Sequence, residues 1–363
     1  MVSPQAGCSD APVGYGKRPH HKIGKRIQDP RFESSVKRLI FLLFLAAAAW
    51  AAYVVLAPAG PSKETFVEIL PGTPTMQIAT QLKQHRLIRS RYAFEAERLA
   101  RGGTLKAGEY RFDHPSTISE VYERLERGDV YTIPVTIPEG SNLFDIAERI
   151  EAANLGAGDK LLAAAHSNVS LIADLDPAAT SLEGYLFPDT YRFERHATPI
   201  QILAAMVKRF RQEAAELGLN DNYHRLVTVA SLVERETPIN SERPLVASVF
   251  ENRLAKKMPL ETDPSVIYAA LLEGRYRGAI YASDLQADSP YNTYRYSGLP
   301  PGPICNPGVA SLKAAMHPAH TGYLYFVAAT ANPSGKSRFS TTLEEHARNV
   351  EQYRKALHAA GTR

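Results

Sequence analysis

The chain has 363 residues, with a hydrophobic content of 44%, a charged content of 22% and a net charge of +4. This apolar content is ordinary for a globular protein, and the length allows two domains. Much of the positive charge lies in the N-terminal tail, so the composition does not predict nucleic-acid binding. Anionic lipid headgroups are the partner that such a tail would meet.

The first predicted element is a membrane-spanning helix over residues 39–57, which contain no charged side chain. At a rise of about 1.5 Å per residue, such a helix just spans a hydrocarbon core of roughly 30 Å. Residues 1–38 carry eight lysines and arginines against three acidic residues, which predicts that they stay in the cytoplasm. A cleaved signal peptide is the alternative, but its basic head would be much shorter. We therefore expect a single-pass anchor in the cytoplasmic (inner) membrane, with the remaining chain on the extracytoplasmic side.

In this topology the two cysteines, Cys8 and Cys305, lie on opposite sides of the membrane and cannot form a disulfide. The sequence has no HExxH motif and no Cys and His cluster at zinc spacing. We therefore expect neither a metal nor a cofactor.

A strand–turn–helix pattern occurs twice after the anchor, 68 residues apart from Val67 to Val135. The first copy places Ile78, Ala79 and Leu82 on one helix face; the second places Ile146, Ala147 and Ile150 there. Between the two copies we predict another strand at 108–112. We also predict another helix, with an apolar face formed by Ile118, Val121, Tyr122 and Leu125. Units this small cannot bury their apolar faces alone, so we expect them to pack together.

These patterns divide the exported chain into a linker at 58–64, a small βα module at 65–131 and a larger domain at 132–363. The small module resembles LysM-like glycan-binding modules, although a plain spacer is an equal alternative. In the larger domain we expect helices at 199–217, 222–236, 244–257 and 264–273, with strands at 131–137 and 323–328. Regular βαβ alternation is lacking, so we predict an α+β fold and not a doubly wound sheet.

The helix predicted at 222–236 carries a candidate general acid near its end. Val227, Ala230 and Glu234 lie on one stripe, and Glu236 points about 200° away from Glu234. A carboxyl held against apolar surface, close to the negative end of the helix dipole, acquires a raised pKa, which suits general acid catalysis. The alternative is a surface glutamate that pairs with Arg235 or Arg243.

Seven segments in order carry a resemblance to the MltG (YceG-like) family of endolytic murein transglycosylases. They are EGYLFPDTY at 183–191, ASLVERET at 230–237, TDPSVIY at 262–268, YNTY at 291–294, GLPPGPI at 298–304, NPG at 306–308 and YLYFVA at 323–328. The resemblance covers nearly everything from the anchor to the C-terminus.

This resemblance implies that Glu234 is the catalytic acid, that a LysM-like module precedes the catalytic domain, and that peptidoglycan synthases are partners. The chain departs from the family pattern at two positions near its C-terminus. Ser337 replaces a histidine two residues before Phe339, and Ala347 follows His346 where the family has asparagine.

The activity implied is cleavage of the MurNAc–GlcNAc bond of peptidoglycan, which trims or terminates glycan strands. One glutamate would protonate the glycosidic oxygen and then take the proton of the C6 hydroxyl, leaving a 1,6-anhydro end. Two other functions stay open. A muramidase-type hydrolase would need a second carboxylate, Asp189 or Asp263, beside Glu234. A non-catalytic peptidoglycan-binding scaffold would need neither.

The same segments supply candidate substrate contacts. Asp263 is expected either to cap a helix or to bind substrate. Aromatic faces stack on pyranose rings, and side-chain amides form hydrogen bonds with N-acetyl groups. The other candidate substrate contacts are aromatic, amide and acidic residues: Glu183, Tyr185, Asp189, Tyr291, Asn292 and Tyr294.

Overall fold

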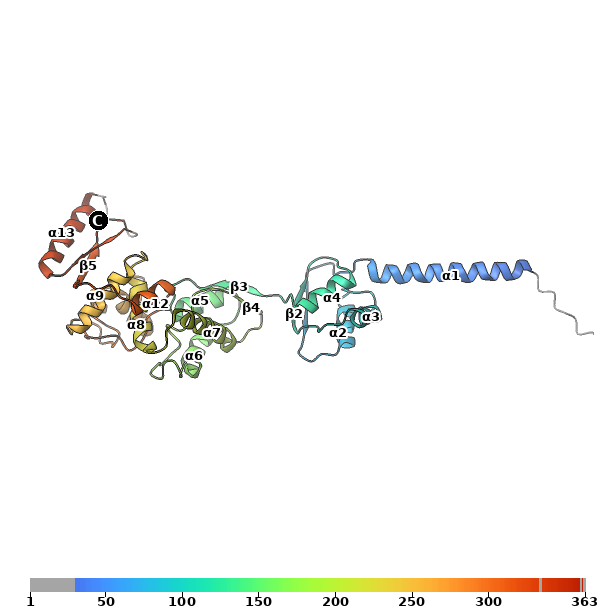
Figure 1. Ribbon diagram of the computed structural model, residues 1–363, viewed down its shortest axis with the longest axis horizontal. Coiled ribbons are helices and arrows are strands. Elements are labelled where there is room, and N and C mark those ends of the chain that lie inside the picture. Colours follow the sequence, from blue (N-terminus) through green and yellow to red (C-terminus); the bar gives the residue numbers. More distant parts are fainter. Residues whose placement is uncertain (1–29, 333–334, 360, 362–363) are drawn as a thin grey trace, which may run out of the picture. The chain divides into compact units, whose positions relative to one another are not determined.

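The computed structural model describes residues 30–332, 335–359 and 361. Helices are combined with short strands (Figure 1). The strands pair as β1-β2, β3-β4 and β5-β6 in two-stranded sheets, and the last two pairs are antiparallel. The expected mixture of helix and sheet is thus confirmed, and the described residues contain no doubly wound sheet. Most of the predicted cytoplasmic tail, including Cys8, lies outside the described residues.

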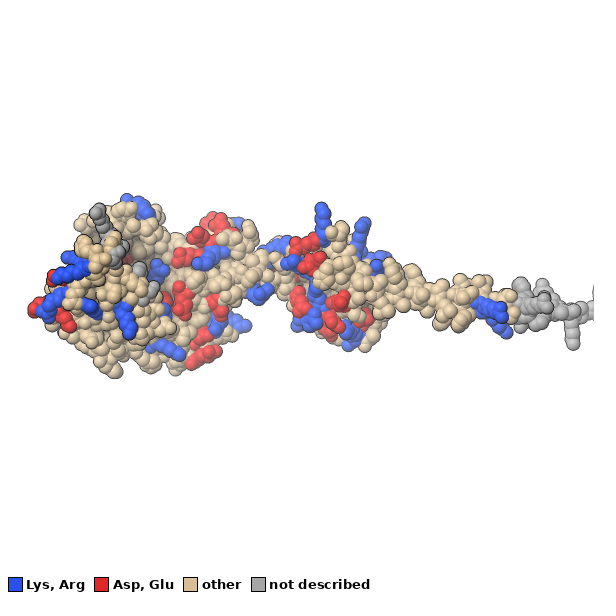
Figure 2. Space-filling view, turned by 90° about the horizontal axis from the view of Figure 1, so that it is seen from above, with Lys and Arg blue, Asp and Glu red and all other residues tan. Residues whose placement is uncertain are grey.

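One long apolar helix, α1 (Pro30–Leu56), begins the described chain. Its segment Ser34–Leu56 is long and apolar enough to cross a membrane, and almost none of it is buried in the protein. Beyond Lys37 and Arg38 its surface carries no charged side chain, as the uncoloured stretch of this helix in Figure 2 shows. Length and composition therefore agree with the predicted anchor.

The chain separates into two compact units. The first comprises the described residues up to Val67, together with Gly72–Leu105 and Phe112–Arg127; the second comprises Glu68–Pro71, Lys106–Arg111 and the chain from Gly128 onward. The elements after α1 and before Gly128 are β1 (Thr65–Ile69), α2 (Thr75–Gln84), α3 (Arg91–Arg101), β2 (Gly108–Phe112) and α4 (Ile118–Arg127). The apolar faces predicted for α2 and α4 are buried, as expected.

The end of α1 is bonded to the first unit. Arg89 donates to the carbonyl oxygens of Ala57 at 2.7 Å and Pro58 at 2.8 Å, and its guanidinium lies 4.7 Å from the ring centre of Tyr53. Ala59 and Ser116 exchange two backbone hydrogen bonds of 2.8 Å. The start of the predicted linker is therefore part of the folded unit, because these bonds satisfy carbonyls that a helix end leaves free.

The second unit contains the larger core. Its elements are β3 (Ile133–Thr136), α5 (Leu143–Ala152), α6 (Gly158–Ser167), a 3-10 turn (Val169–Leu171), β4 (Thr190–Phe193), α7 (Pro199–Leu217), α8 (Tyr223–Glu236), α9 (Arg243–Ala255), α10 (Asp263–Leu272), α11 (Ala282–Leu285), α12 (Val309–Met316), β5 (Tyr325–Ala328), β6 (Ser337–Ser340) and α13 (Leu343–Ala359). The four predicted helices are confirmed to within two residues at each end. The prediction lacked α3, α6, α11, α12 and α13.

Local sequence explains why α7 and α8 begin or end where they do. Thr198 and Gln201 form a capping box around Pro199 at the start of α7, and Gly218 ends it in the left-handed region at φ 72°. Helix α8 ends at Glu236, since Thr237 precedes a proline and is extended.

Helix α8 is the central element of the second unit. Its residues from Val227 to Val233 are all buried. The helix packs against α9 and α12 (Figure 1), and it also packs against α10. Its first and last turns are less buried than this middle part. The two glutamates of the last turn leave the core in different directions.

Candidate active site

Glu234 lies in a buried ion pair. Its Oε1 accepts a hydrogen bond from Arg243 Nη2 at 2.8 Å, and its Oε2 accepts one from the backbone N–H of Gly308 at 3.0 Å. The side chains of Glu234 and Arg243 are each 5% exposed. Of the two bonding partners expected from the sequence, Arg243 is the one found, but the pair is not at the surface. Both carboxylate oxygens thus face N–H donors.

The turn of the second strand–turn–helix repeat closes over this ion pair. Gly140, at φ 77°, approaches the end of α8 so closely that a Cβ on it would lie 3.5 Å from Glu234 Cγ. Its carbonyl oxygen accepts a bond of 3.3 Å from Arg235, and its N–H donates to the Asn306 carbonyl oxygen at 3.0 Å. Half-exposed Glu139 lies beside the pair, 3.8 Å from Arg243. Burial, and then the charge of Glu234, raise the pKa of Glu139.

Glu183 forms a buried junction behind the ion pair. It accepts hydrogen bonds of 2.9 Å from the Leu143 N–H and the Asn306 side-chain amide, and one from the Tyr268 hydroxyl. Burial raises the pKa of Glu183 to about 8, and the bonds from Leu143 and Tyr268 oppose that rise. Asn306 also accepts from the Leu186 N–H at 2.8 Å. This junction ties the start of α5 to the loop that carries Gly308.

Glu236 occupies a different environment, in a cavity of about 250 Å³. The lining is predominantly polar and includes Glu236, Arg253, Glu261, Thr262, Asp263, Tyr294, Phe326 and His346. In the described part of the chain, no residue forms a hydrogen bond or an ion pair with the Glu236 side chain. The Glu236 carboxyl is thus partly buried and has no bonding partner among the described residues.

The surroundings of Glu236 favour its protonated form. The pKa of Glu236 is raised to about 7, first by burial and then by the charge of Asp263, while the guanidinium of Arg253 opposes both. A carboxyl with a pKa near the working pH can both donate and accept a proton. Glu236 therefore meets the electrostatic requirement that the sequence analysis assigned to Glu234.

Asp263 and Tyr294 are the predicted substrate contacts that line this cavity. The Tyr294 hydroxyl donates to Asp263 at 2.7 Å. Helix α10 begins at Asp263, and Thr262 holds the preceding cap position, so the prediction of Asp263 as an N-cap is wrong. The reason is that proline tolerates the first turn of a helix, which lets the helix start one residue before Pro264.

The other predicted contacts have partners inside the protein. The Tyr185 hydroxyl donates to buried Asp176 at 2.6 Å, and buried Asn292 donates to the carbonyls of Leu285 and Ala287 at 2.9 Å. Tyr291 packs edge-on against Tyr268, with ring centres 5.1 Å apart. Asp189 pairs with Arg209 at 2.7 Å. A substrate role for Glu183 and these four residues stays a prediction.

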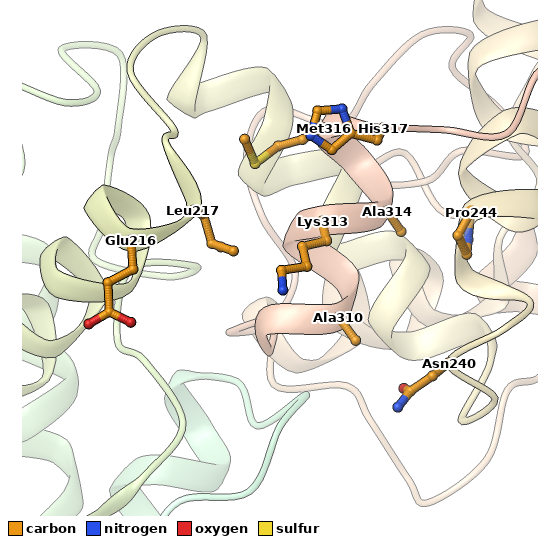
Figure 3. Close-up of a pocket in the computed structure, with 9 residues that line it drawn as sticks. All are labelled: Glu216, Leu217, Asn240, Pro244, Ala310, Lys313, Ala314, Met316 and His317. Atoms are coloured by element: carbon orange, nitrogen blue, oxygen red, sulfur yellow. The ribbon is translucent and has the colours of Figure 1, made fainter.

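A second, more open cavity of about 490 Å³ lies elsewhere in this unit (Figure 3). Lys313 of α12 and His317, which follows this helix, line it together with Glu216 and Leu217 from the end of α7. None of the predicted site residues lines it. The polar cavity around Glu236 is therefore the stronger candidate for chemistry.

Sequence reasoning did not single out Arg253 or His346 as site residues, and both line the same cavity as Glu236. A signal for Glu236 was present, because Asp263 and Tyr294 belong to two of the family-like segments and surround it. The orientation of α8 within the core, which no local pattern specifies, decided which glutamate faced them.

Comparisons with known proteins agree with the resemblance. The YceG-like family model matches residues 67–352. A Bacillus subtilis (strain 168) protein named endolytic murein transglycosylase is 35% identical over 322 residues, covering 82% of this chain and 88% of that protein. A Streptococcus pneumoniae serotype 2 protein of the same name is 29% identical over 354 residues, covering 87% of this chain and 64% of that protein.

A solved structure supports the same assignment. The crystal structure of a yceG-like protein from Listeria monocytogenes is 34% identical, with a TM-score of 0.51, and the match covers 79% of this chain and 99% of that one. The family model matches well over half of the chain, and the similarity extends across both folded units. This chain belongs to the YceG-like family.

Proposed function

We propose that this protein is an endolytic murein transglycosylase, a lyase that cleaves the MurNAc–GlcNAc bond of peptidoglycan strands and leaves a 1,6-anhydro-MurNAc end. The relatives that carry this name are the first support. The single observation that carries the site is the polar cavity with Glu236 on its wall.

We assign the acid to Glu236 because of what each glutamate contacts. Both oxygens of Glu234 accept hydrogen bonds from N–H donors, those of Arg243 and Gly308, so this carboxyl is already engaged by protein partners. Glu236 has its pKa raised to about 7 and faces the cavity. Glu234, favoured by the sequence, is the alternative acid, and in the present assignment it positions the end of α8.

One carboxyl is sufficient for this reaction. The protonated acid donates to the glycosidic oxygen as the bond to C1 of N-acetylmuramic acid breaks. The C6 hydroxyl of the same sugar then attacks C1, and the carboxylate takes the hydroxyl proton. The acid is restored, a 1,6-anhydro ring forms and no water is consumed.

A muramidase-type hydrolase is the second candidate, and one observation favours it. Asp263 lines the same cavity as Glu236 and raises its pKa, so two carboxyls lie close together. Glycosidases commonly use such a pair, one as acid and one to activate water or hold the sugar. The end group of the product distinguishes the two reactions.

The rest of the chain fits an enzyme of the cell wall. We propose that α1 is a single-pass anchor in the cytoplasmic membrane, with both folded units outside the cytoplasm. We also propose that residues 65–131 are a LysM-like glycan-binding module and 132–363 the catalytic domain. Peptidoglycan synthases are the protein partners that we expect.

The test is digestion of isolated peptidoglycan by the full-length protein in detergent, with product ends identified by mass spectrometry. We expect 1,6-anhydro ends from the wild type. Glu236→Gln should lower the rate by about 10²- to 10⁴-fold, the usual contribution of a general acid. Glu234→Gln should lower it less and should lower thermal stability, because it leaves Arg243 buried without its charge partner.

Each other outcome has a distinct meaning. Loss of cleavage by a folded Glu234→Gln variant, with Glu236→Gln active, would assign the acid to Glu234. Reducing ends would establish the hydrolase, with Asp263→Asn as the next variant. Binding without cleavage by the wild type would favour the non-catalytic scaffold.

A further inference from the structure

One wall of the Glu236 cavity comes from the C-terminal segment. Phe326 of β5 and His346 of α13 line it, opposite residues from the loop before α10. Strands β5 and β6 pair antiparallel, and α13 packs on both (Figure 1). The β5-β6 hairpin and α13 therefore complete the cavity. They lie at the C-terminal end of the chain, after the six family-like segments that precede residue 323.

The imidazole of His346 is held in a fixed place. It stacks on the Tyr325 ring with centres 5.1 Å apart and planes inclined by 21°. The Arg253 guanidinium lies 5.2 Å from the centre of the same Tyr325 ring. Arg253 also donates to the Leu324 carbonyl oxygen at 2.7 Å and to the Pro259 and Leu260 carbonyls at 3.0 Å. Arg253 thus joins α9, the C-terminal hairpin and the loop before α10.

His346 has hydrogen-bonding capacity that the protein does not use. Its Nδ1 is buried and has no hydrogen-bond partner among the described residues. Buried polar atoms in native proteins are almost always bonded, so this exception is a hydrogen-bonding group of the cavity wall that the described residues leave unused. Burial, and then the Arg253 charge, lower the pKa of His346, so the ring is neutral at neutral pH. A neutral imidazole has one donor and one acceptor, which suits hydroxyl and amide groups of a sugar.

We propose that His346 is a substrate-contacting residue that hydrogen-bonds the N-acetylated sugar held in the Glu236 cavity, with Tyr325 fixing its ring. This proposal rests on the proposed function, because it names a contact within the same site. It gives α13 a role in recognition of the glycan. Neighbouring Ala347 is exposed and does not line the cavity.

The experiment measures both cleavage and binding with the full-length protein in detergent. His346→Ala and His346→Gln are compared with His358→Ala, a matched control at an exposed position of the same helix. We expect His346→Ala to raise KM for soluble glycan fragments about five- to tenfold, as loss of a hydrogen bond does, with a smaller change in kcat. His346→Gln should recover part of the loss, and His358→Ala should match the wild type.

Binding is measured separately, by titrating the same glycan fragments into Glu236→Gln and into Glu236→Gln with His346→Ala. The second protein should bind about five- to tenfold more weakly at an unchanged melting temperature. Equal binding by the two folded proteins, or an unchanged KM in His346→Ala, overturns the proposal. Binding that depends on His346 in a protein with no cleavage activity would refute the proposed function and retain the contact.

Discussion

Glu234 and Glu236 are separated by one residue, yet they have opposite surroundings. At about 100° per residue, side chains two positions apart on a helix project in nearly opposite directions. The first meets Arg243 and the Gly308 N–H, and the second enters the polar cavity. Burial in that cavity, beside the acid Asp263, favours the protonated form of Glu236.

The pH dependence of cleavage follows from the protonation of Glu236. Because the acid must carry a proton and its pKa is raised to about 7, kcat/KM should fall as the pH rises above about 7. Asp263→Asn removes a charge that raises this pKa, so the alkaline limb should move to lower pH. Measured pH–rate profiles check this, with Asp159→Asn at an exposed site as the control. A limb that stays in place in Asp263→Asn would contradict the assignment.

The same glutamate should make stability depend on pH. Its pKa rises from an ordinary 4.5 to about 7 on folding, so the folded protein holds the proton more tightly. The resulting stabilisation is complete below pH 4.5 and is lost as the pH rises through about 7. Urea unfolding at pH 5 and pH 8 should show a smaller difference for Glu236→Gln than for the wild type. Equal differences would show that Glu236 is not the group responsible.

At the scale of elements, the two strand–turn–helix repeats share a backbone and differ in use. Both turns place a glycine in the left-handed region, Gly72 at φ 79° and Gly140 at φ 77°. A Cβ on Gly72 would meet nothing within 4 Å, whereas one on Gly140 would contact Glu234. The second copy therefore packs against the end of α8, beside the ion pair of Glu234 and Arg243.

The junction between this turn and α12 can be tested through Gly308. A Cβ on Gly308 would lie 1.9 Å from Glu139 Oε1, so Gly308→Ala requires that side chain to move. We expect a loss of about 1–3 kcal/mol in the free energy of unfolding, as overpacking usually costs. Adding Glu139→Ala should restore most of it, since the clash is with a half-exposed side chain. Additive losses in urea unfolding would refute the clash.

Arg89 provides the test for the end of α1. Its loss removes two charge-assisted hydrogen bonds to the helix end, so Arg89→Ala should destabilise the first unit by about 1.5–3 kcal/mol. Limited proteolysis within residues 57–64 should become faster than in the wild type. Lys83→Ala, at an exposed position of α2, serves as the control. Unchanged cleavage in Arg89→Ala would mean that this segment is a flexible linker after all.

At the scale of the whole molecule, α1 and the folded units differ in where their apolar side chains lie. Most side chains of α1 are apolar and exposed, which is consistent with a membrane-spanning helix, whereas apolar side chains of the two units are buried within them. The space-filling view shows mixed charges over the folded units and none along the middle of α1 (Figure 2). The surface of α1 is thus suited to lipid, and the charged surfaces of the folded units are suited to water.

Membrane integration can be tested by placing charge in the centre of α1. Leu43→Arg with Phe44→Arg should each cost about 2.5–3.5 kcal/mol of insertion free energy. The doubly substituted protein should leave the membrane fraction on alkaline extraction, while Leu43→Phe with Phe44→Leu should remain. Retention of the arginine variant would indicate that another segment holds the protein to the membrane.

Much of the fold was predictable because it depends on local periodicity. The extent of α7, the faces of α2, α4 and α5, and the apolar α1 all follow from spacing, capping residues and composition. The family also followed from ordered segments of unusual composition. For the candidate site, the sequence predicted which segments contribute, namely α8 and the segments around Asp263 and Tyr294. It did not predict how these segments pack against one another.

What the sequence by itself determined was the long apolar helix α1, the type and limits of most helices, and the family. Only the tertiary structure decided that Glu234 pairs with Arg243, that Glu236 faces the cavity, and that His346 completes its wall. The physical reason is that helix formation depends on neighbours within one or two turns. The pKa and accessibility of a carboxyl depend instead on burial and on charges brought together from distant parts of the chain.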